Sequence, residues 1–147
     1  MTSAELQRRL RGRRETQKLN RVRLAAAEII TTRTLTHAEV PAAALETVRG
    51  FWNTTTEPTA TRGISQEGLD PWAEELLTHQ GFNTKAYLLT DLDLAPWIEF
   101  RIPPTPWFAT IRRAQDASWV FLRHDFGAVA AVSEQEHNFE FFAAQLP

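Results

Sequence analysis

The clearest hydrophobic pattern in the chain lies in its middle third. Three runs rich in aromatic and β-branched residues, at 97–102, 107–113 and 118–123, are separated by short polar or proline-containing breaks. A shorter apolar run follows at 128–132. Such runs are typical of β-strands, and the short breaks favour antiparallel pairing because parallel strands need a long crossover. We therefore predict four consecutive antiparallel strands.

The runs differ in the faces that they offer. Polar and apolar positions alternate strictly in 97–102, which predicts a half-buried strand. The run at 118–123 is apolar on both faces and is therefore the best candidate for a central strand. An earlier run at 85–90 is also apolar on both faces and predicts a further strand. The expected sheet has four or five strands.

Helical periodicity marks the segments before the sheet. Residues 3–31 are predicted to form one long helix, whose apolar stripe at spacings of three and four begins only at Leu19. Its first half is expected to project, fray or dock on something else. A second helix is predicted at 41–51, because Pro41 suits the first helical position, and residues 53–64 read as a loop.

A third helix is predicted between Asp70 and Gly81. Asp70 is expected to cap it, Pro71 suits its first position, and Gly81 is the expected left-handed residue after its end.

The C-terminal segment carries two competing patterns. Ser133-x-x-Glu136 matches a capping box directly before an apolar helical stripe, which predicts a helix at 134–145. The alternating apolar positions from His137 to Phe141 fit an edge strand instead. We favour the helix because cap and period agree.

These elements predict an α+β fold in a single domain over 1–147, the default for a chain of this length. In this interpretation, 1–33 is a long basic helix and 34–84 is a helical part. The antiparallel meander sheet occupies 85–132, and the C-terminal helix occupies 133–147.

Composition excludes several kinds of site. The chain has no cysteine, so thiol nucleophiles, iron–sulfur clusters and cysteine-based zinc sites are excluded. No apolar run approaches the ~20 residues of a membrane span, and the first residues are charged and lack the apolar core of a signal peptide. We expect a soluble, cytoplasmic protein without membrane contact.

Charge is distributed unevenly along the chain. Residues 1–33 hold nine cationic side chains against three carboxylates, a net charge of +6, so the remainder carries −8 within a total of −2. This asymmetry indicates a polyanionic partner, or else an ordinary solvated helix face. The basic segment consists of Arg8, Arg9, Arg11, Arg13, Arg14, Lys18, Arg21 and Arg23.

Candidate catalytic residues are few. Glu134-x-x-His137 has the spacing of one half of a di-iron helix pair, but the sequence shows no second half. His124 beside Asp125, at an expected hairpin end, is a candidate general base, although adjacent residues in a strand point to opposite faces. We expect no metal and no cofactor, and we lean against an enzyme.

Tryptophans offer a candidate binding face. Trp97 shares a strand face with Glu99 and Arg101, and Trp107 is expected near it across the proline-rich break. If this face is open, it has the aromatic and arginine anchors of a binding hot spot. If helices cover it, the rings belong to the core.

The sequence therefore predicts a non-enzymatic protein–protein interaction module, such as an inhibitor or immunity-type protein or a subunit of a larger assembly. Its partner would be another protein or a second copy of the chain. One alternative is a nucleic-acid-binding accessory protein that uses residues 8–23. A second alternative is a small enzyme that uses a histidine–carboxylate pair.

Overall fold

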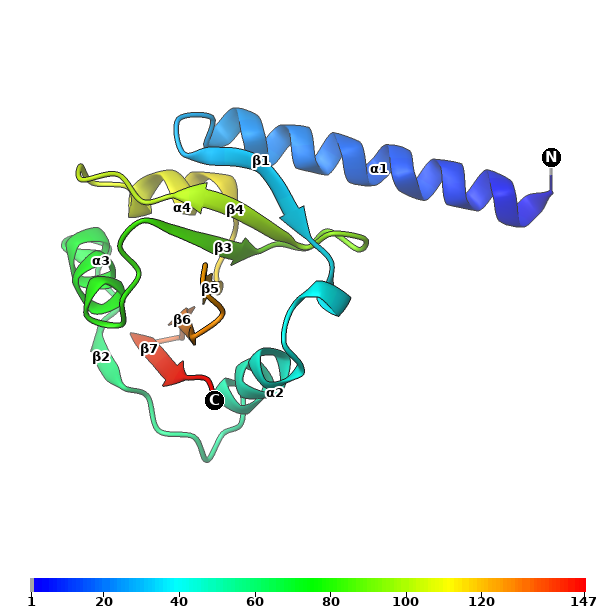
Figure 1. Cartoon of the computed structure of the whole chain (residues 1–147). Helices are drawn as coiled ribbons and strands as arrows, with labels where there is room; N and C mark the ends of the chain where they lie inside the picture. Colours follow the sequence, from blue (N-terminus) through cyan, green and yellow to red (C-terminus); the bar gives the residue numbers. More distant parts are fainter. Residues whose placement is uncertain (1) are drawn as a thin grey trace.

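The computed structural model describes residues 2–147, which fold around one sheet (Figure 1). The helices are α1 (Ser3–Ala25), η1 (His37–Glu39, a 3-10 helix), α2 (Ala42–Phe51), α3 (Leu69–His79) and α4 (Phe108–Ala114). The strands are β1 (Ile30–Leu35), β2 (Ala60–Gly63), β3 (Lys85–Leu89), β4 (Trp97–Arg101), β5 (Trp119–Arg123), β6 (Ala128–Glu134) and β7 (Asn138–Gln145).

The strands of the described residues form a single seven-stranded sheet in the order β1-β4-β3-β5-β6-β7-β2. Every pairing in it is antiparallel. The α+β class is as predicted, whereas the sheet has seven strands in place of four or five. β5 is the middle strand, which agrees with its apolar residues on both faces.

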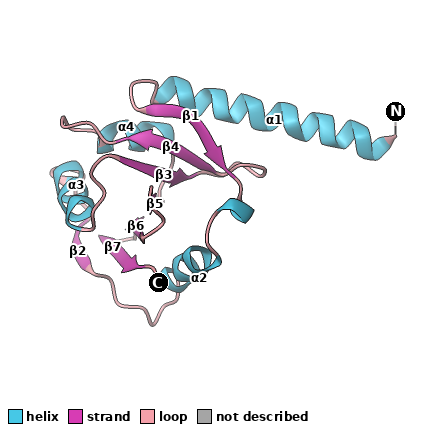
Figure 2. Cartoon of the chain, in the orientation of Figure 1, coloured by secondary structure: helices cyan, strands magenta, loops and turns pink. Residues whose placement is uncertain are grey.

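Helices cover both faces of the sheet (Figure 2). On one face, α3, α4 and the turn after α1 pack on Phe100, Phe121 and Phe139. The second half of α1 extends this layer through a small cluster around Ile98. On the other face, α2 packs on a second apolar cluster that includes Trp97. Two-sided burial explains why strands in the middle of the sheet are apolar at nearly every position.

The predicted strand after the proline-rich loop is instead helix α4, and contacts from α3 explain the difference. The Glu74 carboxylate accepts hydrogen bonds from the backbone N–H groups of Trp107 and Phe108 at 3.3 and 3.2 Å. These N–H groups stand at the start of the helix and have no acceptor within it. Asp70, one turn earlier on α3, forms a two-bond pair with Arg112 at 2.7 and 2.8 Å. The hydrogen bonds that Arg112 donates to Asp70 raise the pKa of Arg112.

Three further boundaries differ from the prediction. The first helix ends at Ala25, not at residue 31, and Ile30 opens strand β1. The expected loop at 53–64 contains β2, so 34–84 is not wholly helical. The predicted C-terminal helix at 134–145 is wrong because this segment consists of the end of β6, a turn and β7. β7 is not an edge strand either, since β2 pairs outside it.

Arg123, at the end of β5, ties the sheet to the end of α3. Its Nη1 donates to the Gln80 carbonyl at 2.9 Å, and its Nε donates to the Asp125 carboxylate at 2.7 Å. Asp125 also accepts the Gly127 N–H at 2.9 Å. The hydrogen bond from Arg123, which has the largest effect, and the one from Gly127 both lower the pKa of Asp125. A Cβ added at Gly127 would collide with the Arg123 guanidinium.

Gly127→Ala is expected to lower the free energy of unfolding by about 1 kcal/mol, because the guanidinium must shift and its hydrogen bonds to Gln80 and Asp125 are weakened. Gly50→Ala is the matched control. Gly50 lies inside α2 with open space around its Cα, so alanine there should stabilise by about 0.5–1 kcal/mol. Urea denaturation measures both. Equal stability of the Gly127→Ala variant and the unsubstituted chain would contradict the assigned role of Arg123.

Candidate functional site

Helix α1 is anchored to the rest of the chain through its second half. Val22 is buried in a small cluster with Leu92 and Ile98, and Leu19 packs against the same cluster half-buried. The first half of the helix continues past the sheet and ends far from the other helices (Figure 1). We call residues 3–14 the arm.

Glu15 holds the helix at the point where the arm begins. Its carboxylate accepts the backbone N–H of Leu94 at 2.8 and 2.9 Å and that of Ala95 at 2.9 Å. One turn further along, the Lys18 ammonium lies 3.8 Å from the Asp91 carboxylate. Glu15 therefore fastens α1 to the 90–96 loop between β3 and β4.

The arm carries a dense cationic charge. Its five arginines, at positions 8, 9, 11, 13 and 14, are exposed, and Glu5 is its only carboxylate. Within residues 2–147, no hydrogen bond or ion pair joins the arm to the body of the protein. The N-terminus of the arm is capped by its own residues, because Thr2 and Glu5 form a capping box.

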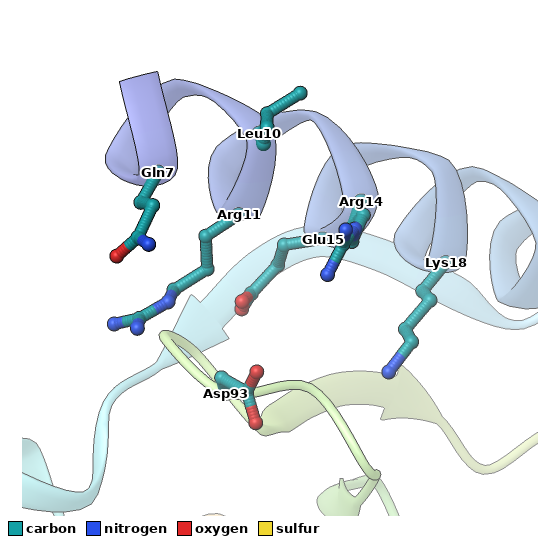
Figure 3. Close-up of a pocket in the computed structure, with 7 residues that line it drawn as sticks. All are labelled: Gln7, Leu10, Arg11, Arg14, Glu15, Lys18 and Asp93. Atoms are coloured by element: carbon teal, nitrogen blue, oxygen red, sulfur yellow. The ribbon is translucent and has the colours of Figure 1, made fainter. Parts of the chain in front are cut away.

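A polar groove of about 560 Å³ separates the arm from the 90–96 loop. Figure 3 shows Arg11, Glu15 and Lys18 on the side of the helix that faces the loop, with Asp93 opposite them. Glu15 already accepts backbone N–H groups. Asp93 is the only carboxylate of the 90–96 loop that lines the groove. The cationic side chains that line the groove come from α1.

The predicted basic segment 8–23 thus consists of two different parts. Lys18, Arg21 and Arg23 belong to the anchored half of α1. The Arg23 Nη2 donates to the Thr32 carbonyl at 3.3 Å, and Arg21 lines a depression against the loop before β5. The arginines at positions 8 to 14 belong to the arm and face solvent.

The predicted tryptophan face is not an open surface. Trp97 and Trp107 are 0% and 3% exposed, and they lie in different apolar clusters, so they do not share a face. Glu99 is buried and accepts the Thr31 hydroxyl at 2.8 Å. Arg101 alone of the predicted partner-binding residues is exposed. Helices on both faces of the sheet enclose the rings.

The candidate catalytic residues are not brought together. His124 is exposed on the turn between β5 and β6, and its neighbour Asp125 is bound to Arg123 and to the turn backbone. His137 is exposed on the turn at the other end of β6, roughly 20 Å away for a seven-residue strand. Glu134 ends β6, so the helical spacing expected for Glu134 and His137 does not exist.

Two site features escaped the sequence interpretation. The first is Glu15, whose partners lie 79 and 80 positions away along the chain. The second is Trp52, which caps the end of α2 and is 45% exposed beside a shallow pocket. A signal for Trp52 was present, because two adjacent aromatic residues on a helix cannot both face the core.

Two other kinds of site were sought in the described part of the chain. No helix within residues 2–147 is long and apolar enough to cross a membrane. No group of three or more histidine, aspartate or glutamate residues within the same range is arranged to hold a metal ion.

Glu15→Ala is expected to release the 90–96 loop and to lower the free energy of unfolding by about 1–2 kcal/mol, because two backbone N–H groups lose a charged acceptor. Chymotrypsin should then cleave the loop at Leu92 or Leu94 faster than in the unsubstituted chain. Gln17→Ala, at an exposed position of the same helix, is the control and should leave cleavage unchanged. Equal cleavage rates in both variants would show that Glu15 does not hold the loop.

Comparison of the chain with models of known protein families, with curated proteins and with solved structures gives no match. Functional inference for this chain therefore depends on its own geometry and charge.

Proposed function

We propose that this chain is a non-enzymatic interaction module that contacts a protein partner through the arm. One observation carries the proposal: residues 3–14 continue α1 beyond the body of the protein, with five exposed arginines that pair with nothing in the described chain. The predicted aromatic face plays no part in it, because Trp97 and Trp107 are buried.

The physical cost of the arm supports a binding role. Short isolated helices are marginal in water, and the arm adds repulsion because Arg9 and Arg13 are separated by four residues and Arg8 and Arg11 by three. Each like-charge pair at such spacing costs about 0.2–0.5 kcal/mol. No apolar packing offsets this cost before Leu19. Contact with an acidic surface would remove the repulsion and neutralise the arginines.

A protein partner agrees with the charge of the chain as a whole. Residues 34–147 carry −8, so the rest of the chain already carries charge opposite to that of the arm. The enzyme alternative has less support, because the candidate histidines lie at opposite ends of β6 and expose their rings to solvent.

A second candidate function, nucleic-acid binding, is favoured by how the arginines surround the helix. At about 100° per residue, Arg9 and Arg11 lie on nearly opposite sides of the arm. A helix with cations all round is suited to a groove lined by phosphates on both sides. The acidic body disfavours this candidate, because it repels a long polyanion near the arm.

The arm variant combines Arg8→Glu, Arg9→Glu and Arg13→Glu. It is expected to lose the protein partner without losing its fold. Captured from an extract of the native host at low salt after nuclease treatment, the partner should bind the arm variant about ten- to a hundredfold more weakly than the unsubstituted chain, because each exposed ion pair contributes up to about 1 kcal/mol. The thermal transition should not change, since the replaced side chains touch nothing in the body.

The matched control changes net charge equally on the body by combining Arg49→Glu, Lys85→Glu and Arg101→Glu, all at exposed positions. It should retain the partner. Equal retention by the control and the arm variant would refute the proposal. Duplex DNA is the second probe: a slope of log K against log salt of roughly −4 to −5 that disappears in the arm variant would establish the nucleic-acid candidate instead.

A further inference from the structure

A shallow pocket of about 450 Å³ lies where three strands of the sheet end beside α2. Leu89 and Val120 form part of its apolar lining, and the exposed indole of Trp52 forms another part. Asp91 and Glu134 also line it, and the Asp91 carboxylate lies 3.8 Å from the Lys18 ammonium. No lysine or arginine belongs to this lining.

The pocket is held in shape from below and from the side. The Trp52 ring packs edge-on against Phe142, with ring centres 6.2 Å apart. Under the rim, Ser133 is buried and hydrogen-bonded to Ser118, their oxygens 3.2 Å apart, and Gln135 donates to the same Ser133 hydroxyl. These contacts fix the indole and the end of β6 before any ligand arrives.

This combination of groups is chemically selective. An aromatic ring attracts a cation placed over its face, carboxylates bind a guanidinium through its planar fork, and apolar walls suit the methylene stem of arginine. A neutral or anionic ligand would leave the Glu134 carboxylate without a cation, whereas Asp91 already lies beside Lys18 of its own chain. The pocket is therefore suited to an arginine side chain.

We propose that the pocket formed by Trp52, Asp91 and Glu134 receives an arginine from the arm of a second copy of the chain. This inference rests on the proposed function of the arm and adds the identity of its partner. Charge complementarity supports the second copy: the arm supplies arginines, and the pocket supplies the Glu134 carboxylate, the Asp91 carboxylate that it shares with Lys18, and an exposed indole.

The arm cannot occupy the pocket of its own chain without breaking α1. The helix is continuous from Ser3 to Ala25, and Glu15 fixes it to the 90–96 loop. The arm therefore leads away from that point in a straight line (Figure 1). An arm of 12 residues reaches about 18 Å beyond the anchor, which places its arginines where a neighbouring molecule can accept them.

Sedimentation velocity of the full chain tests the inference. At about 20 mM salt the chain is expected to associate, and at about 500 mM salt it should be monomeric, because the contact is electrostatic and exposed. The arm variant and a pocket variant, Glu134→Lys, should each be monomeric in both conditions. Glu46→Lys, which makes the same charge change on an exposed position of α2, is the control and should associate normally.

Mixing the two monomeric variants gives the decisive observation. The arm variant still has an intact pocket, and Glu134→Lys still has an intact arm, so an equimolar mixture should recover association at low salt. A general loss of folding or of net charge cannot produce this recovery. Trp52→Phe, which keeps a ring of lower affinity for cations, should weaken association about two- to tenfold.

Three results would overturn the inference. These are a monomeric unsubstituted chain at low salt, association that Glu134→Lys leaves unchanged, and a mixture that stays monomeric. Suppose that the unsubstituted chain is monomeric and that the arm variant loses a different protein in the capture experiment. The partner is then not a second copy of the chain, but the function proposed for the arm holds. If the arm variant loses nothing, the proposed function itself fails.

Discussion

Burial of the sheet on both faces is the constraint on which the rest of this structure depends. Seven antiparallel strands are covered by α3 and α4 on one side and by α2 on the other. Of the five tryptophans, three are buried, one is half-buried on α3, and only Trp52 is substantially exposed. Most of the tryptophans are thus used in the core.

The same constraint explains which elements could be predicted from local sequence. Runs that are apolar on both faces, at 85–90 and 118–123, identify β3 and β5, because only a strand in a covered sheet needs such a run. Alternation also existed in the last segment, where Phe139 and Phe141 are buried on one face of β7. The capping-box pattern at Ser133 outweighed it, although Ser133 in fact lies within β6, next to its last residue, and bonds to Ser118.

Other elements depend on partners far away in the sequence. Helix α4 carries residues that favour strands, and it is helical because Glu74 and Asp70 on α3 bind its first N–H groups and its Arg112. The β-branched run from Ile30 to Thr34 gave a local sign that the first helix must end before it. For the site, the arginines of the arm are visible in the sequence, whereas the Glu15 contact with the 90–96 loop is visible only in the fold.

The molecule therefore has two parts of opposite charge. One is the arm, the first half of α1, and the other is the body, to which the second half of α1 is anchored. The arm is positive and lacks apolar packing, while residues 34–147 are negative and contain most of the buried core. Glu15 decides where one part ends and the other begins, since it is the first residue of α1 to bind the body. Both proposals follow from this division: a cationic helix without a partner, and an acidic body with one exposed indole beside carboxylates.

Hydrogen exchange along α1 tests the division most directly. In the monomer at high salt, amides of residues 6–14 should exchange at least about tenfold faster than those of residues 19–25, because only the second half of the helix is packed. At low salt and high protein concentration the arm amides should become protected, while those of 19–25 remain unchanged. Arm amides as protected as the anchored half in the high-salt monomer would contradict the account, because the arm would then have a partner within its own chain.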